Sequence, residues 1–188
     1  MKKLCISLCA AAMFAGCTTM ISTVKPKDPA DPVKGYVYGQ FYQNNKIQTS
    51  MRLVVKNVET GKTDTIYMNL KQFFSEPEHY GVHAMLPGKY QIVSLSISYS
   101  ETQGQKKLSL DTEKPFTHPV MSQPFEVKAG EKVYIGDFIA SSEKVGNAIS
   151  WSLNTAYTYA DTTKEINVKY PNIASLPSRE VFVLNKTK

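Results

Sequence analysis

One short segment of the 188-residue chain holds the densest group of possible metal ligands. Its members are Glu76, Glu78, His79 and His83. Two histidines four residues apart share one face of a helix and could bind Zn²⁺ together. However, Pro77 disfavours a helix and Tyr80–Leu86 has the composition of a strand, so a metal site needs a further ligand that the sequence does not identify. We expect a polar loop with an outward-facing histidine, no structural metal and no other cofactor.

The remaining histidine, His118, lies between Thr117 and Pro119, with no obvious nucleophile nearby. The chain contains no GxSxG elbow, P-loop or dinucleotide-binding fingerprint. The three cysteines all lie near the start of the chain, at Cys5, Cys9 and Cys17. We therefore predict that the protein is not an enzyme. An envelope hydrolase or metalloprotein centred on His79 and His83 is the alternative.

Three aromatic residues near the end of the chain could form a binding platform. Trp151, Tyr157 and Tyr159 carry flat rings, and such rings can stack on the apolar faces of sugars. In a strand, however, Trp151 and Tyr157 point to the same side as Leu153 and could pack into a core instead. The orientation of these rings decides between a carbohydrate site and a core.

The first residues have the pattern of an export signal. Lys2 and Lys3 precede the apolar run Leu4–Ala15, which is long enough for a signal-peptide core and too short to cross a membrane as a helix. After this run, no segment has the roughly 20 consecutive apolar residues that a transmembrane helix needs. We expect an exported protein whose body lies outside the cytoplasm.

The apolar run ends in Phe14-Ala15-Gly16-Cys17, which resembles the lipobox of bacterial lipoproteins. The family usually has leucine where Phe14 stands. The resemblance implies cleavage before Cys17, a thioether-linked diacylglycerol on its sulfur and a further acyl chain, such as palmitate, on the new amino terminus. Two or three acyl chains hold a protein on a membrane durably. Ordinary secretion, with cleavage after the small residues at 10–12, is the alternative.

The residue after the cysteine, Thr18, is not the aspartate that retains enteric lipoproteins in the inner membrane, so we expect an outer-membrane protein facing the periplasm or the cell surface. Three prolines then recur every third residue, at Pro26, Pro29 and Pro32. This period is that of a polyproline II helix. We therefore divide the chain into a signal peptide (1–16), a lipidated N-terminus and tether (17–34) and one globular domain (35–188).

The globular domain consists of short β-branched and aromatic segments bounded by turn residues, which predicts strands. The predicted strands are Gly35–Gln43, Met51–Val58, Thr63–Met68, Tyr80–Leu86, Lys89–Tyr99, Pro124–Lys128, Lys132–Ala140, Ala148–Tyr157 and Glu180–Leu184. Segment 104–122 looks like a long loop with at most a weak strand at its start. The number and spacing of the predicted strands indicate an all-β fold with a single sandwich of two sheets.

Local signals set the turns and one helix. Gly61 and Gly130 lie in turns that allow a positive φ, and Pro87-Gly88 fits the centre of a type II turn. Thr162 to Glu165 fits a helix capping box, so we expect a short helix ending near Pro171. In the strand 89–99, Val93, Leu95, Ile97 and Tyr99 alternate with serines, so these four should face the core and the serines should face water.

Two motifs in this domain resemble those of prealbumin-like, or carboxypeptidase-regulatory-like, β-sandwiches in bacterial envelope lipoproteins. They are Leu86-Pro87-Gly88-Lys89-Tyr90 and the stretch from Phe125 to Gly136, and the likeness spans roughly residues 35–140. The resemblance implies an Ig-like sandwich that acts in adhesion, assembly or binding and has no catalytic residues.

The charge of the chain excludes little. Lysine and arginine outnumber aspartate and glutamate by 22 to 16, a formal charge of +6, but the basic residues are spread along the chain. We expect no nucleic-acid partner. The favoured function is a non-enzymatic, membrane-anchored module that binds another envelope protein. A carbohydrate-binding lipoprotein is the alternative, with Trp151, Tyr157 and Tyr159 as its binding residues.

Overall fold

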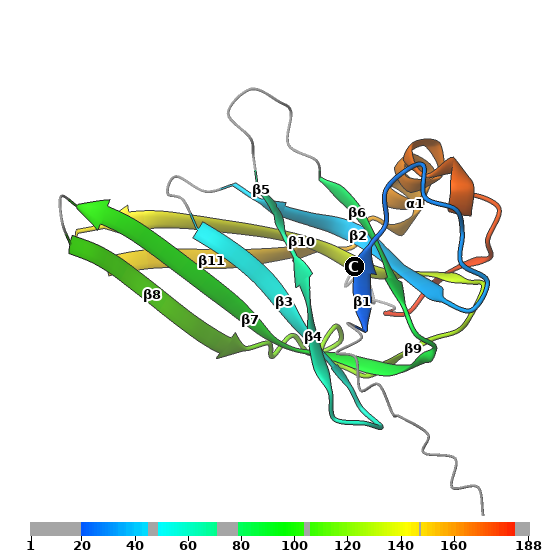
Figure 1. Ribbon diagram of the computed structural model, residues 1–188, viewed down its shortest axis with the longest axis horizontal. Helices are drawn as coiled ribbons and strands as arrows, with labels where there is room; N and C mark the ends of the chain where they lie inside the picture. Colours follow the sequence, from blue (N-terminus) through cyan, green and yellow to red (C-terminus); the bar gives the residue numbers. More distant parts are fainter. Residues whose placement is uncertain (1–19, 45–48, 71–78, 104–105, 147, 183–188) are drawn as a thin grey trace, which may run out of the picture.

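The computed structural model describes residues 20–44, 49–70, 79–103, 106–146 and 148–182. They form two facing β-sheets and one short α-helix, so the predicted all-β sandwich with a short C-terminal helix is confirmed (Figure 1). The helix and the first strand lie in the same half of the molecule (Figure 1).

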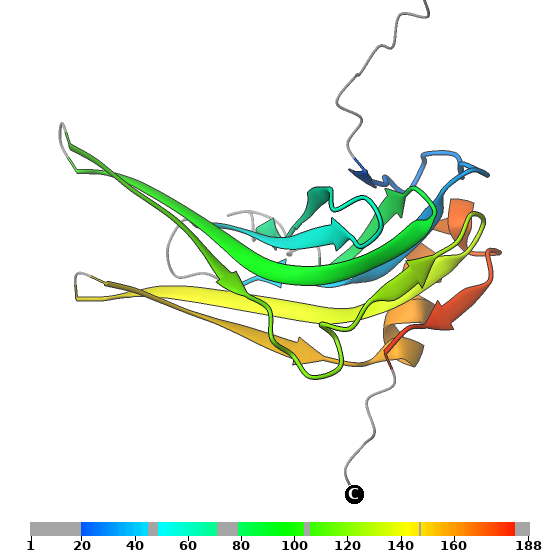
Figure 2. The same ribbon diagram turned by 90° about the horizontal axis from the view of Figure 1, so that it is seen from below.

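The larger sheet has the strand order β1 (Ile21–Thr23), β6 (Tyr80–Met85), β2 (Gly35–Gln43), β10 (Lys132–Val145) and β11 (Ala148–Ala156). Two short strands lie off this path, β5 (Asn69–Leu70) beside β2 and β12 (Ser178–Glu180) beside β10. The smaller sheet has the order β4 (Thr63–Tyr67), β3 (Thr49–Asn57), β7 (Gly88–Gln103) and β8 (Lys106–Pro115), with β9 (Phe125–Val127) beside β7. The hairpins β7–β8 and β10–β11 extend beyond the other strands at one end (Figure 2).

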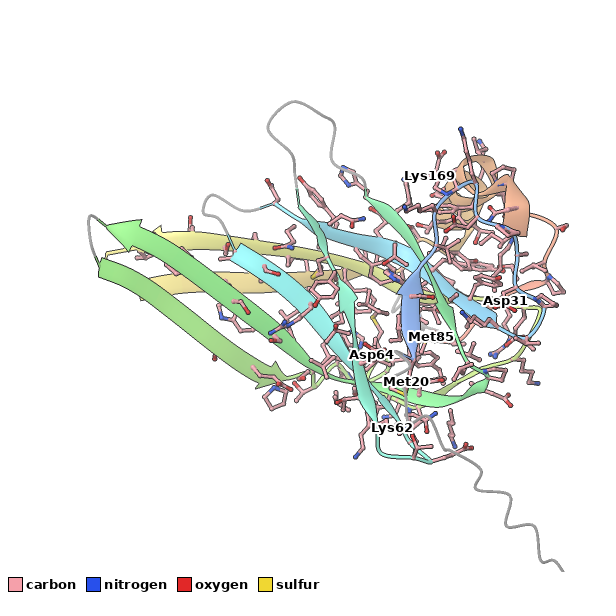
Figure 3. All side chains as sticks on the ribbon, viewed as in Figure 1. Met20, Asp31, Lys62, Asp64, Met85 and Lys169 are labelled. Atoms are coloured by element: carbon pink, nitrogen blue, oxygen red, sulfur yellow. The ribbon has the colours of Figure 1, made fainter. Side chains whose placement is uncertain are left out.

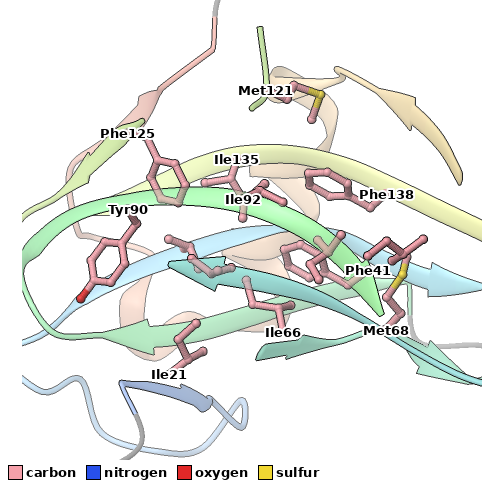
Figure 4. Close-up of a cluster of buried hydrophobic side chains, with 14 of the residues drawn as sticks. Ile21, Phe41, Ile66, Met68, Tyr90, Ile92, Met121, Phe125, Ile135 and Phe138 are labelled. Atoms are coloured by element: carbon pink, nitrogen blue, oxygen red, sulfur yellow. The ribbon is translucent and has the colours of Figure 1, made fainter. Parts of the chain in front are cut away.

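Apolar side chains from both sheets fill the space between them (Figure 4). Phe41 of β2 and Phe138 of β10 stack with their ring centroids 5.9 Å apart. Ile66 of β4 and Ile92 of β7 are fully buried on the facing sheet. Ile21 of β1 belongs to the same cluster, so the first described strand is part of the core.

A second cluster lies on the other face of the larger sheet, beneath the helix α1 (Tyr159–Lys169) and the 3₁₀ turn η1 (Pro171–Ile173). Tyr36 and Tyr38 of β2 are buried there against Ile166 of the helix. Their neighbours Val37 and Phe41 point into the first cluster. Because β2 is buried on both faces, its sequence is apolar and aromatic almost throughout rather than alternating.

A β-bulge in β10 changes which face its side chains reach. Ile135 and Phe138 both point into the core between the sheets although they are three residues apart. The register against β2 shifts beside Gly136, where φ is 112°. This φ is one that residues with a side chain rarely adopt, and a Cβ atom at Gly136 would also displace the end of the Met121 side chain, so the position favours glycine. The bulge places Asp137 on the helix side of the sheet.

The Asp137 carboxylate is fully buried and lies at the start of α1. It accepts hydrogen bonds from the hydroxyls of Tyr134 (2.7 Å), Thr158 (2.6 Å) and Thr162 (3.2 Å). The backbone N–H groups of Gln40 (3.1 Å) and Thr158 (3.3 Å) also donate to it. Thr158 is the N-cap residue, so a carboxylate from β10 binds the N-cap and complements the helix dipole.

A buried lysine on the same strand holds the other end of the helical segment. The Lys132 side chain donates to Asn167 Oδ1 (2.6 Å) and to the carbonyl oxygens of Ile173 (3.0 Å) and Ala174 (2.8 Å). Burial lowers the pKa of this amine, but three acceptors compensate for the water it loses. β10 therefore fixes α1 and η1 at both ends, with a carboxylate at the start and an ammonium group after the end.

The strands predicted between Gly35 and Tyr157 are confirmed, with ends that differ by a few residues. Two strands were not predicted, β1 and β5. β8 lies where a weak strand was expected at the start of segment 104–122, but it is a ten-residue strand that pairs with β7 over its whole length. β1 lies in the expected tether, where Ile21–Thr23 pairs with β6 and Val24 is buried, so the tether does not extend to residue 34. The last predicted strand, Glu180–Leu184, begins two residues too late, since β12 begins at Ser178 and ends at Glu180.

The helix begins at Tyr159 and not at the predicted capping box. Thr162 lies within the helix, fully buried, and its hydroxyl bonds to Asp137. The capping-box prediction is therefore wrong because a residue distant in sequence caps this helix. The predicted stop is confirmed, since α1 ends at Lys169 just before Pro171.

Two predictions about the smaller sheet also need correction. Gly61 and Gly130 have φ of 72°, as expected, but Gly88 is close to extended at 159° and begins β7. The chain passes there from one sheet to the other, so the type II turn is wrong. In β7 a bulge leaves Val93 without a partner on β3, and Ser94 and Ser96 are buried.

We predict that Asp137→Ala lowers the free energy of unfolding by about 3 kcal/mol, because it leaves several buried donors without an acceptor. Asp161→Ala removes an exposed carboxylate from the first turn of the same helix and should cost much less. Urea denaturation of both variants measures the difference. Equal losses would mean that Asp137 acts through helix charge alone and not through its buried hydrogen bonds.

Candidate functional site

The two edge strands β8 and β11 border a pocket on one side of the sandwich. The pocket has a volume of about 380 Å³ and opens to solvent. Its lining comes from β7, from the end of β8 and the loop after it, and from β11: Leu95, Lys114, Pro115, Phe116, Thr117, His118, Trp151, Ser152, Leu153 and Thr155. Apolar and polar residues contribute equally to its walls, five of each. Such a pocket suits an apolar side chain or ring that enters between the sheets.

Trp151 is half-buried in the wall of this pocket. The Nζ atom of Lys114 lies 4.3 Å from the centroid of its ring, a cation–π contact that covers one face of the indole. Trp151 also borders a second pocket of about 330 Å³, with Asn44, Ser141, Ser142, Glu143, Ser150 and Ser152. Trp151 therefore borders both the mixed pocket and a serine-rich one.

The other two predicted binding residues lie elsewhere. Tyr157 packs against Tyr134, with ring centroids 4.8 Å apart, and its hydroxyl accepts the backbone N–H of Phe182 at 2.9 Å. Burial raises the pKa of Tyr157. Tyr159 packs against the same Tyr134 ring and donates to Ser178. The three aromatic residues therefore do not form one platform, and Trp151 alone borders the pockets.

The edge of β11 has an unusual composition for an exposed strand. Its nine residues include no charged residue and no proline. Ser150, Ser152 and Asn154 are exposed and alternate with the half-buried Trp151 and Leu153. In the described part of the chain, β10 is the strand that pairs with β11, so the outer edge of β11 faces no strand. An uncharged edge of this length is a template for a further strand.

The other edges of the two sheets are protected. β8 contains five charged residues and ends in Pro115. β4 is five residues long, and its Asp64 accepts the backbone N–H of Ile21 at 2.8 Å. β1 has three residues. Charge, proline and shortness each hinder pairing with another chain, so β11 is the edge left available among the described strands.

His79 and His83 each pack against an aromatic ring of β2. His79 stacks on Tyr42 with ring centroids 4.2 Å apart. His83 is 4% exposed and packs edge-on against Phe41 at 5.3 Å, so the outward orientation expected in this strand is wrong. Burial lowers the pKa of His83 to about 4, so it is neutral near pH 7.

His118 supports the loop after β8. Its Nδ1 accepts the backbone N–H groups of Met121 (3.0 Å) and Val120 (3.3 Å). Within the described ranges, no group of three or more histidine, cysteine, aspartate or glutamate side chains could hold a metal. Glu76 and Glu78 of the predicted ligand cluster lie outside the described residues.

The predicted lipidation site also lies outside the described residues, since these begin at residue 20. Cys17 and the lipobox residues Phe14, Ala15 and Gly16 therefore stay predictions. The helix search covered the described segments and found no helix long and apolar enough to cross a membrane.

Sequence reasoning missed the pocket residues Lys114 and Phe116 because both belong to the segment that we expected to be a loop. The alternation of Leu108 and Leu110 with polar residues was the available signal for that strand. The absence of charged residues from 148 to 156 was likewise visible in the sequence. The position of this strand at the edge of the sheet was not.

Comparison with known proteins found no match: no family model, no curated protein and no solved structure resembles this chain. The resemblance to prealbumin-like sandwiches stays a prediction.

The protein should lose stability as the pH falls from about 6.5 to about 4. The unfolded chain binds a proton at the ordinary histidine pKa of 6.5, whereas the folded chain binds it at His83 at about 4. The contribution of His83 to the free energy of unfolding is therefore fully present above pH 6.5. About 3 kcal/mol of it is lost by pH 4. Urea denaturation at several pH values measures the slope. His83→Leu should reduce it, and an unchanged slope in that variant would assign the pH dependence to other groups.

Proposed function

We propose that this protein is a non-enzymatic bacterial lipoprotein that is anchored through lipid on Cys17 and binds another envelope protein along the free edge of β11. The observation that carries the proposal is the composition of that edge, a nine-residue strand with no charge and no proline. The partner contributes an extended segment that pairs with β11 and enlarges the sheet by one strand. Main-chain hydrogen bonds provide affinity in this mode of recognition.

The pocket beside β11 supplies specificity. Alternate side chains of an added strand point to the same face as Trp151 and Leu153 of β11. Both residues line the pocket of about 380 Å³, together with Phe116. An apolar or aromatic side chain of the partner fills this space and contacts the exposed part of Trp151. A segment with bulky apolar residues at every second position is therefore the preferred partner.

The anchor rests on the pattern Phe14-Ala15-Gly16-Cys17 and the basic, apolar leader before it. Thr18 after the cysteine favours the outer membrane. The described residues contain no group of side chains that would favour a metalloprotein.

Carbohydrate binding is a second candidate because Trp151 also borders the serine-rich pocket of about 330 Å³. Hydroxyl groups and one aromatic face suit a sugar ring. Lys114 already occupies one face of that indole, which weighs against a stacking platform. Trp151 is the only tryptophan of the chain, so quenching of the intrinsic fluorescence by added glycans distinguishes this candidate from a protein partner.

We predict that Cys17→Ser abolishes incorporation of labelled palmitate in cells while the domain still folds. The reason is that the thioether requires the cysteine sulfur, whereas the described core begins at Met20 and Ile21. Circular dichroism of the released variant checks the fold. Unchanged labelling, or a mature amino terminus at another residue, contradicts the anchor.

We predict that a photocrosslinking amino acid at Asn154 gives a discrete adduct with one envelope protein in intact cells. The same label at Lys164, which is exposed on α1, should not. Adding Ser150→Lys and Ser152→Lys should abolish the adduct, because charge on an edge opposes strand addition.

The matched pair Ser150→Ala and Ser152→Ala leaves the edge uncharged and should retain the adduct. Loss with the alanine pair, or equal adducts from both label positions, contradicts binding along β11.

A further inference from the structure

We infer that the β1 end of the domain rests directly on an anionic lipid surface, which orients β11 away from the membrane. This inference depends on the lipidation of Cys17 in the proposed function. It adds a lipid-binding surface and a fixed orientation that the anchor sequence does not contain.

The distance between the anchor and the folded domain is short. Three residue steps separate Cys17 from Met20, so the chain between them spans about 10 Å at most, at roughly 3.3–3.6 Å per residue. A free tether as far as residue 34 would have reached roughly 60 Å at the same extension. The described fold therefore confines the domain to the layer next to the headgroups.

β1 is held firmly enough to transmit this constraint. Ile21 is 7% exposed, lies opposite Met85 in the sheet, and donates its N–H to Asp64 at 2.8 Å. Met20 packs against the same core. Val24 donates its N–H to the Val82 carbonyl at 2.9 Å, which continues the attachment past the strand. The chain therefore enters the domain at a fixed point.

The surface around this entry point combines exposed lysines with exposed apolar side chains. We call it the anchor surface, and it consists of Lys56, Val58, Lys62, Leu86 and Lys89. All five residues are exposed, Val58 by 42% and Leu86 by 46%. Figure 3 shows Lys62 and Asp64 near Met20, and Met85 on the same part of the molecule.

Contacts join the parts of the anchor surface. The N–H of Val58 donates to the carbonyl of Lys89 at 2.8 Å, which joins the end of β3 to the start of β7. Leu86 directly follows Met85, the partner of Ile21. The carboxylate of Glu126 in β9 is paired with Lys128 at 3.5 Å. Glu59 and Asp64 are the acidic groups of the β3–β4 hairpin, and Asp64 accepts the N–H of Ile21. The three lysines of the anchor surface outnumber these two carboxylates, so it has a small net positive charge.

The lysines of the anchor surface and its position beside the predicted anchor both favour a lipid bilayer as its partner. Each lysine close to an anionic bilayer contributes about 1 kcal/mol, which corresponds to roughly fivefold in binding. Val58 and Leu86 can enter the headgroup boundary beside the acyl chains. β1 and β11 are the opposite ends of the strand order in the larger sheet, so the edge proposed for the partner lies some 20 Å farther across the sheet, at about 4.8 Å per strand.

The test uses the full acylated protein in vesicles of phosphatidylcholine with phosphatidylglycerol and a headgroup-labelled acceptor lipid. A donor dye is attached at Thr60→Cys in the β3–β4 turn or, as the control, at Val145→Cys in the β10–β11 hairpin. Val145 is 57% exposed and is the last residue of β10. The far end of the β10–β11 hairpin lies away from β1 in both ribbon views (Figures 1 and 2). Because Cys17 is acylated and the leader is removed, each variant has one free thiol. Energy transfer should be several-fold stronger from position 60 than from position 145.

A triple variant should reduce the difference in energy transfer between positions 60 and 145; it carries Lys56→Gln, Lys62→Gln and Lys89→Gln. Vesicles of pure phosphatidylcholine should reduce the difference in the same way. Equal transfer from both positions in acylated protein overturns the inference and leaves the proposed function standing. An unchanged contrast in the lysine variant likewise overturns the lipid-binding surface. Protein that carries no acyl mass on Cys17 contradicts the proposed function itself, and the inference with it.

Discussion

The buried carboxylate of Asp137 is the group on which the helical side of this protein depends. Hydroxyl and backbone donors from three elements bind it: Tyr134 and Gln40 in the sheet, and Thr158 and Thr162 at the helix. Among the described ion pairs, none involves Asp137. The position of α1, the path of the chain after β11 and the second apolar cluster all follow from placing this carboxylate.

β10 makes this arrangement possible because it performs several tasks at once. Its bulge at Gly136 directs Asp137 to the helix while Phe138 returns to the core. Its first residue, Lys132, donates to the carbonyl groups beyond the helix end. The same strand then extends with β11 past the sandwich and presents the edge to which we assign the partner. The helix therefore stabilises the strand that supports the proposed binding edge.

The two edges of the larger sheet have different properties. β1 is short, is tied to β6 and to Asp64, and carries the chain towards the predicted anchor. β11 is long, uncharged and bordered by the pocket of Trp151. In a membrane-bound protein this difference separates the surface that meets lipid from the surface that meets another protein. Attachment at one edge leaves the other accessible.

The sequence by itself determined the fold class, because alternation and turn glycines such as Gly61 and Gly130 act locally. Long-range contacts decided the rest. β8 is a strand because β7 lies beside it, β1 because β6 does, and α1 starts at Tyr159 because Asp137 meets it from another strand. For the candidate site, Trp151 was identified from its residue type, but only the tertiary structure separated it from Tyr157 and Tyr159. Residue types are local properties, whereas the edge of a sheet and the wall of a pocket exist only when distant segments have packed together.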